Sequence, residues 1–229
     1  AMVVCGDFEP EAMLAEIKRR LLDIKASGEI KRIYPEEPEG IVKDYVEQDM
    51  EVSRPLYAIG IKDKPFEDSK NFTKEDIVKK HIAIEILLNM IIGKSSDLYK
   101  KLYDEGILFS VPSLDYEFSR DYAHVLITGQ SPEPEKVYEK FKEEVLNMKE
   151  NKIDSNEFNR IKKRIYGEYV KEYNDTADIA RMFLADFFKE INSFDYLEEI
   201  VTINEQYAEQ ILQNVFDEKK MIISVIKKA

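Results

Sequence analysis

The sequence of 229 residues is poor in the residues that build metal and disulfide sites, with one cysteine, two histidines and no tryptophan. The single cysteine, Cys5, excludes a disulfide within the chain and is typical of a cytoplasmic protein. The histidines, His81 and His124, lie far apart, which excludes a compact His-rich zinc site, and a Cys-rich zinc ribbon is excluded as well. Eight glycines and eight prolines are too few for a collagen-like or low-complexity chain, so the composition predicts a globular protein.

Positive charge is also scarce, with 34 Lys and Arg against 46 Asp and Glu and a formal net charge of −12. Phosphate backbones and anionic lipids would repel such a chain, so we expect no nucleic-acid and no membrane partner. No apolar run approaches the roughly 20 residues of a membrane span, since the longest is interrupted by Glu85 and Asn89. The start of the sequence shows no basic-then-apolar signal peptide, and we expect a cytoplasmic location.

Hydrophobic periodicity predicts alternating blocks of strands and helices. Pro10 opens one helix, Thr73 caps another, and Asp154 with Glu157 resembles a capping box. Residues 34–40, rich in proline and charge without any period, predict a linker. The expected elements are a strand at 2–5, a helix to 27, strands at 42–50 and 56–61, helices at 73–93 and 95–106, strands at 107–118 and 122–128, helices at 132–148, 154–173, 177–191 and 204–216, and a strand at 221–226.

This order of elements predicts an α+β fold in two layers, an antiparallel sheet packed against clustered helices. Residues 3–11 also resemble residues 126–135, because both passages predict a strand, a glycine, a short turn and a helix that starts with Pro and Glu. Internal duplication and ordinary strand-to-helix chemistry are both compatible with this similarity.

Two short patterns suggest site chemistry that the neighbouring residues do not complete. His81 and Glu85, one helical turn apart, could offer two zinc ligands, but His81 lies on the apolar stripe of its helix without a third ligand nearby. We therefore interpret His81 as a packed, hydrogen-bonded histidine. Residues 93–96, Gly-Lys-Ser-Ser, resemble the end of a phosphate loop, but the first glycine of that loop is missing and a helix precedes it. The residues by themselves complete no active site.

The segment 93–110, GKSSDLYKKLYDEGILFS, resembles the signature of the second domain of the insulinase/pitrilysin-like zinc peptidases. In that family a small-residue cap leads into a helix with Leu-aromatic-x-x-Leu-Arg, then Gly and a strand that carries Tyr. Residues 3–11 are similar to the segment that ends the family's catalytic first domain, and residues 128–135 and 201–226 follow in the family order. The resemblance covers nearly the whole chain and is closest to the bacterial cytosolic branch.

This resemblance implies the metallopeptidase half-fold, similar to that of mitochondrial processing peptidase. In these enzymes the motif H-x-x-E-H and a downstream Glu bind zinc in the first domain, and this sequence lacks those positions. The resemblance therefore implies no catalytic residue and no metal ligand in this chain, with zinc in the full-length parent. It divides the chain into residues 1–28, the last strand and helix of the catalytic domain, a linker at 29–41 and a C-terminal insulinase-like domain at 42–229.

The residues that the resemblance assigns to substrate binding are Ser96, Tyr99, Tyr103 and Phe109. In many members the helix Arg and the strand Tyr reach the scissile peptide, where an Arg can stabilise the developing oxyanion. Aligned on Leu102 and Gly106, the corresponding residues are Tyr103, which can donate a hydrogen bond, and Phe109, which cannot. These two aromatic side chains could instead only pack the helix against the strand.

The leading hypothesis is the non-catalytic C-terminal half of a cytoplasmic insulinase-like zinc metallopeptidase, inactive alone, which completes the substrate chamber and binds peptides by strand pairing. Its expected partner is the N-terminal catalytic half of the same polypeptide or a homologous subunit. The alternative is a non-peptidase structural or partner subunit paired with an active homologue. A third hypothesis, an unrelated enzyme, would use His81 or His124. The first strand and helix lack sheet partners, so we expect them to pack on a neighbouring copy or to exchange amide hydrogens fast.

Overall fold

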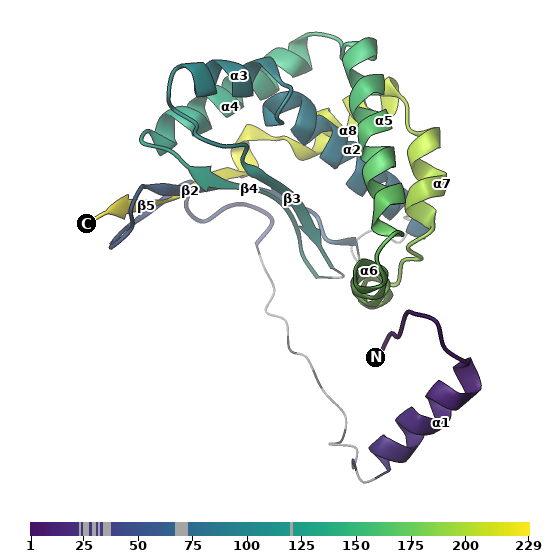
Figure 1. Cartoon of the computed structure of the whole chain (residues 1–229). Helices are drawn as coiled ribbons and strands as arrows, with labels where there is room; N and C mark the ends of the chain where they lie inside the picture. The colour runs from purple at the N-terminus through teal and green to yellow at the C-terminus, as the bar shows by residue number, and fades with distance from the viewer. Residues whose placement is uncertain are drawn as a thin grey trace.

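The computed structural model describes residues 1–22, 24, 28, 31, 33, 38–66, 73–119 and 121–229, in which helices cover one face of a five-stranded sheet (Figure 1). The strands are β1 (Tyr45–Met50), β2 (Leu56–Asp63), β3 (Ser113–Phe118), β4 (Ala123–Gln130) and β5 (Met221–Lys228). Their order in the sheet is β1-β5-β2-β4-β3. β1 pairs with β5 in parallel, and the other neighbours pair antiparallel. The predicted two-layer α+β fold is confirmed.

Most of the described helices begin at a side chain that accepts a hydrogen bond from a free N–H group of the first turn. They are α1 (Pro10–Leu21), α2 (Lys74–Ile92), α3 (Asp97–Asp104), α4 (Pro134–Glu150), α5 (Ser155–Glu172), α6 (Thr176–Lys189), α7 (Asp195–Thr202) and α8 (Glu205–Val215). Thr73 and Asp76 form a capping box at α2, and Asp154 accepts a hydrogen bond from the backbone of Glu157 at α5. None of the described helices is long and apolar enough to cross a bilayer.

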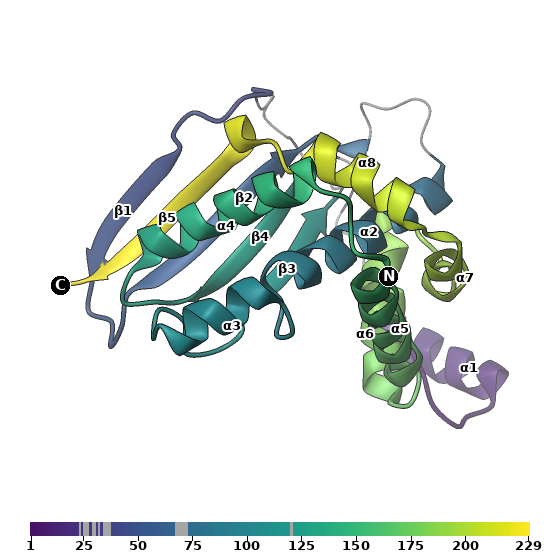
Figure 2. The same cartoon turned by 90° about the horizontal axis from the view of Figure 1, so that it is seen from above.

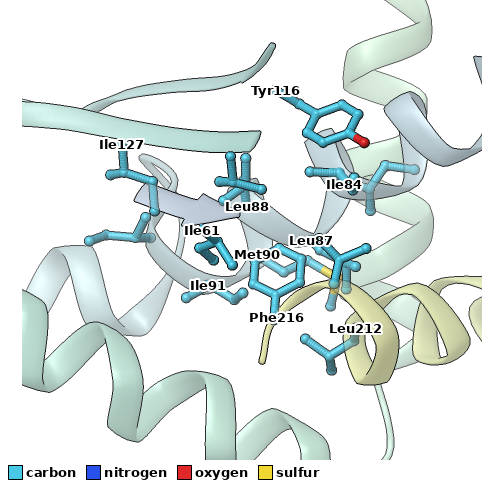
Figure 3. Close-up of a cluster of buried hydrophobic side chains, with 14 of the residues drawn as sticks. Ile61, Ile84, Leu87, Leu88, Met90, Ile91, Tyr116, Ile127, Leu212 and Phe216 are labelled. Atoms are coloured by element: carbon cyan, nitrogen blue, oxygen red, sulfur yellow. The ribbon is translucent and has the colours of Figure 1, made fainter. Parts of the chain in front are cut away.

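The core lies between the sheet and α2, α4 and α8, which cross above the strands (Figure 2). Along β2 the buried side chains alternate, so that Tyr57, Ile59 and Ile61 all point toward the helices. Helix α2 is buried over most of its surface, because α5, α7 and α8 pack on it from the side away from the sheet. Figure 3 shows Leu88 of α2 in the cluster with Ile61 and Phe216.

Two predicted strands differ from the structure. Residues 2–5 form no strand, because in the described chain no neighbouring strand pairs with them. The strand expected at 107–118 begins only at Ser113. Ile107 and Leu108 instead donate their backbone N–H groups to the carbonyl of Leu102, at 2.8 and 3.1 Å, and bury their side chains under the end of α3. Helix α7 is an element that the periodicity did not separate.

Helix α1 lies apart from the sheet and its covering helices (Figure 1). It has no buried residue, and Leu14 and Leu21 on its apolar side are 51% and 43% exposed. Most of the predicted linker at 29–41 lies outside the described residues. The domain boundaries at 28 and 41 therefore stay a prediction.

Candidate functional site

Residues 93–96 end α2 and begin α3, and their packing fixes the direction of α3. A Cβ at Gly93 would lie 2.5 Å from the backbone oxygen of Asn89, so only glycine fits. The hydroxyl of Ser96 accepts a hydrogen bond from the N–H of Tyr99 at 3.1 Å, and Ser96 is buried. Ser96 thus caps the helix and faces inward, and its predicted contact with substrate stays a prediction.

The outer side of α3 carries a pair of tyrosines. Leu98 and Leu102 bury the inner side of the helix. Tyr99 and Tyr103 lie one turn apart beside these leucines, with their ring centres 5.9 Å apart; Tyr99 is half-buried against the core, and Tyr103 is 52% exposed. The buried leucines hold the helix against the core, so the ring of Tyr103 is presented to solvent.

Phe109 follows the turn at the end of α3 and is 44% exposed. The guanidinium of Arg54, from the loop between β1 and β2, lies 4.3 Å above the centre of its ring, within the range of a cation–π interaction. Arg54 is itself exposed. Sequence reasoning missed Arg54, because no local pattern connects a loop residue before Pro55 with an aromatic residue so far along the chain. We call Arg54, Tyr99, Tyr103 and Phe109 the α3 surface.

The two edge strands, β1 and β3, are the places where an extended peptide could extend the sheet. β3 begins at Ser113, shortly after Phe109, so the chain leads directly from the α3 surface to a sheet edge. Every residue of β1 is exposed. The arrangement offers backbone groups for pairing close in sequence to aromatic and cationic side chains.

His81 and Glu85, whose spacing alone could have suited zinc, each contact a different tyrosine. His81 is within 2.7 Å of the Tyr196 hydroxyl through its Nδ1 atom, and burial together with the charge of Lys189 lowers the pKa of His81 to about 3. Tyr169 donates a hydrogen bond of 2.5 Å to Glu85, whose pKa burial raises to about 7. The interpretation of His81 as a packed, hydrogen-bonded histidine is confirmed. No group of three His, Cys, Asp or Glu residues in the described chain could hold a metal ion.

A second buried polar cluster joins α2 to the sheet. The ammonium of Lys80 lies 2.6 Å from the carboxylate of Asp63, and the Tyr116 hydroxyl donates to the same carboxylate at 2.7 Å. Lys80 and Asp63 are both buried. No local pattern in the sequence indicates this cluster, because its members come from β2, α2 and β3. We assign it a role in holding α2 on the sheet.

The comparisons with known proteins agree with this geometry. The family model described as the peptidase M16 inactive domain matches residues 1–165. The uncharacterized zinc protease YmfH of Bacillus subtilis (strain 168) is 27% identical over 221 residues, which are 95% of this chain and 49% of that protein. The chain therefore spans about half the length of this relative.

Solved structures show the same fold. An M16-like peptidase from Alicyclobacillus acidocaldarius matches 97% of this chain and 52% of its own, with a TM-score of 0.83 and 22% identity. A protease from Helicobacter pylori matches 97% of this chain and 53% of its own, with a TM-score of 0.78 and 20% identity. The peptidase M16 inactive domain from Pseudomonas fluorescens matches 96% of this chain and 50% of its own, with a TM-score of 0.68 and 14% identity.

Proposed function

The chain belongs to the family of the peptidase M16 inactive domain, and we propose that it is the non-catalytic C-terminal half of a zinc metalloendopeptidase. In this proposal it pairs with an N-terminal catalytic half, in the same polypeptide or in a homologous subunit, and completes the substrate chamber. The zinc ion and its H-x-x-E-H motif belong to that catalytic half. The relative YmfH, which is named a zinc protease and is about twice as long as this chain, supports a protein with one catalytic and one non-catalytic half.

The observation that carries the proposed peptide binding is the α3 surface beside a sheet edge. A peptide that pairs with β3 would gain main-chain hydrogen bonds, which are independent of sequence. Tyr103 and Phe109 would then contact apolar side chains, and Arg54 could receive a carbonyl or carboxylate of the peptide. Stacking and cation–π contacts of this kind are worth about 0.5–1.5 kcal/mol each.

Peptide titration of the isotope-labelled chain tests the proposal. We expect an unfolded peptide to shift the NMR signals of α3 and β3 and the chain alone to cleave nothing. Arg54→Ala and Tyr103→Ala should each weaken binding several-fold, whereas Tyr166→Ala, which removes a tyrosine of similar exposure from α5, should not. Stoichiometric zinc together with peptide cleavage by this chain alone would refute the assignment of catalysis to a partner half.

The departure from the family pattern at Tyr103 and Phe109 keeps a second function open, a structural or partner subunit without peptidase activity. The two functions differ in the activity of the complex with the natural partner. If removal of the α3 side chains lowers peptide hydrolysis by that complex, the chain contributes to the substrate chamber. If hydrolysis is unchanged while the complex still requires the chain for assembly, the structural function is correct.

A further inference from the structure

A pocket of about 500 Å³ opens beside α6. Helix α6 lies at the end of the helical layer away from α3 (Figures 1 and 2). Four helices build its walls. Side chains that line it include His81 of α2, Tyr169 and Glu172 of α5, Asp186 and Lys189 of α6, and Tyr196 of α7. A cavity rather than packed core therefore lies under α6, whose only fully buried residue is Asp186.

Asp186 is a buried carboxylate without a cation. It is 6% exposed, and the Ser193 hydroxyl donates a hydrogen bond of 2.7 Å to one of its oxygens. In the part of the chain that the structure describes, Asp186 forms no salt bridge, and burial raises its pKa. Lys189 acts on it only from a distance, because its ammonium lies 4.2 Å above the ring of Phe118. A buried carboxylate that lacks a cation gains strongly when one binds.

The tyrosines around the pocket supply further acceptors. Tyr169 uses its hydroxyl hydrogen on Glu85, and Tyr173 donates to the backbone oxygen of Ser193 at 3.0 Å. Their oxygens can then only accept hydrogen bonds from a ligand. Aromatic rings also attract a cation through their faces.

The rim of the pocket is acidic on balance. Asp178 is paired with Arg181, whereas Glu172 has no cationic partner among the described residues. Burial and the neighbouring Asp178, Asp186 and Glu168 raise the pKa of Glu172, which shows that negative charge is concentrated at this place. An anionic ligand would be repelled here, and a purely apolar ligand would leave the Asp186 carboxylate without a cationic partner.

We propose that this pocket binds the basic side chain of a lysine or an arginine, with the cationic group at Asp186 and the alkyl stem against Met182 and Ala185. Both of these apolar residues line the pocket. The size of the pocket suits one long side chain with part of its backbone. The inference does not depend on the proposed substrate chamber, because the pocket and the α3 surface lie at different ends of the helical layer.

The test is a titration of the isotope-labelled chain with an acetylated tripeptide amide, Gly-Lys-Gly. A matched tripeptide with norleucine in place of lysine keeps the alkyl stem and lacks the charge. We expect saturable NMR shifts in α5, α6 and α7 with the lysine peptide and not with the norleucine peptide. Asp186→Asn keeps an acceptor for Ser193 but loses the charge, and should weaken binding at least about tenfold, or about 1.4 kcal/mol. Glu139→Gln makes the same change of charge at an exposed position of α4, and this variant should bind the lysine peptide as the unchanged chain does.

Each outcome decides between the alternatives. Equal binding of the norleucine peptide, or unchanged binding by Asp186→Asn, would overturn the inference. If Asp186→Asn fails to unfold cooperatively, Glu172→Gln takes its place, and it should weaken lysine binding several-fold. If spermidine saturates the pocket while the lysine peptide causes no shift, the pocket binds free polyamines, and the proposal that it binds a peptide side chain is wrong. Shifts confined to α3 and β3 would refute this inference while supporting the proposed function.

Discussion

Glu85 should make the stability of the fold depend on pH. Its carboxyl lies in α2 at the contact with α5, where Tyr169 donates to it. Burial raises its pKa from the ordinary value of 4.5 to about 7; Tyr169 and Arg164 lower it, and Glu168 and Glu172 raise it. The folded chain therefore holds a proton that the unfolded chain releases, and Glu85→Gln replaces the protonated carboxyl by a neutral group of the same shape.

The direction and size of the change in unfolding free energy with pH follow from proton linkage. A group whose folded pKa is raised contributes its full stability below the unfolded pKa of 4.5 and loses it as the pH rises through about 7. At about 1.36 kcal/mol per unit, the whole loss is about 3 kcal/mol. Between pH 5.5 and 8 the unchanged chain should lose about 2 kcal/mol that the Gln variant keeps. Partial exposure of the side chain makes this value an upper bound.

Urea unfolding at pH values from 5.5 to 8 measures this difference directly. The free energy of unfolding of the Gln variant, minus that of the unchanged chain, should rise with pH and level off above pH 7.5. Glu139→Gln, an exposed position on α4, should show a difference that does not change with pH. If the difference for Glu85→Gln is also independent of pH, the raised pKa of Glu85 is wrong.

Three further predictions test the packing. Lys80→Met should cost about 3–5 kcal/mol of unfolding free energy, because it leaves the carboxylate of Asp63 buried without its cationic partner. In the same urea titration, the double variant that also carries Asp63→Leu should regain most of this loss. Gly93→Ala should destabilise the chain, because its Cβ would lie 2.5 Å from a backbone oxygen. Gly167→Ala should stabilise the chain by about 0.5–1 kcal/mol, because Gly167 lies within α5 and a Cβ there would meet no other atom within 4 Å. Equal thermal midpoints of the two variants would contradict both expectations. Phe216→Ala should cost about 3–5 kcal/mol through the cavity that it leaves in the core, and a calorimetric loss below about 1 kcal/mol would contradict the packing in Figure 3.

The sequence predicted those features of the fold that depend only on residues close together in the chain. Thr73 and Asp154 cap helices as expected, since a cap needs only the backbone of the next turn. The strand at 2–5 was wrong because a strand exists only beside another strand, and an apolar run cannot show whether that partner is present. Ile107 and Leu108 were assigned to a strand for the same reason, although their apolar side chains serve the turn after α3.

The candidate sites were less predictable. The resemblance identified Tyr103 and Phe109, but the cation above Phe109 comes from another loop and has no counterpart in a local motif. The hydrogen bond between Asp186 and Ser193 joins α6 to the turn that follows it, and in the sequence Asp186 is one acidic residue among 46. Burial, which gives this carboxylate its chemistry, is a property of the whole fold.

The place of β5 in the sheet has a consequence for the order in which the molecule can assemble. β5 is the last strand along the chain, yet it lies between β1 and β2, the first two. During synthesis β1 has no hydrogen-bonding partner until residues 221–228 have emerged, while β2, β3 and β4 can already form their hairpin and pair. Assembly of the sheet is therefore completed by contacts between distant parts of the chain, which are slow to form. A truncation that removes this strand would divide the sheet and release β1, rather than trim its edge.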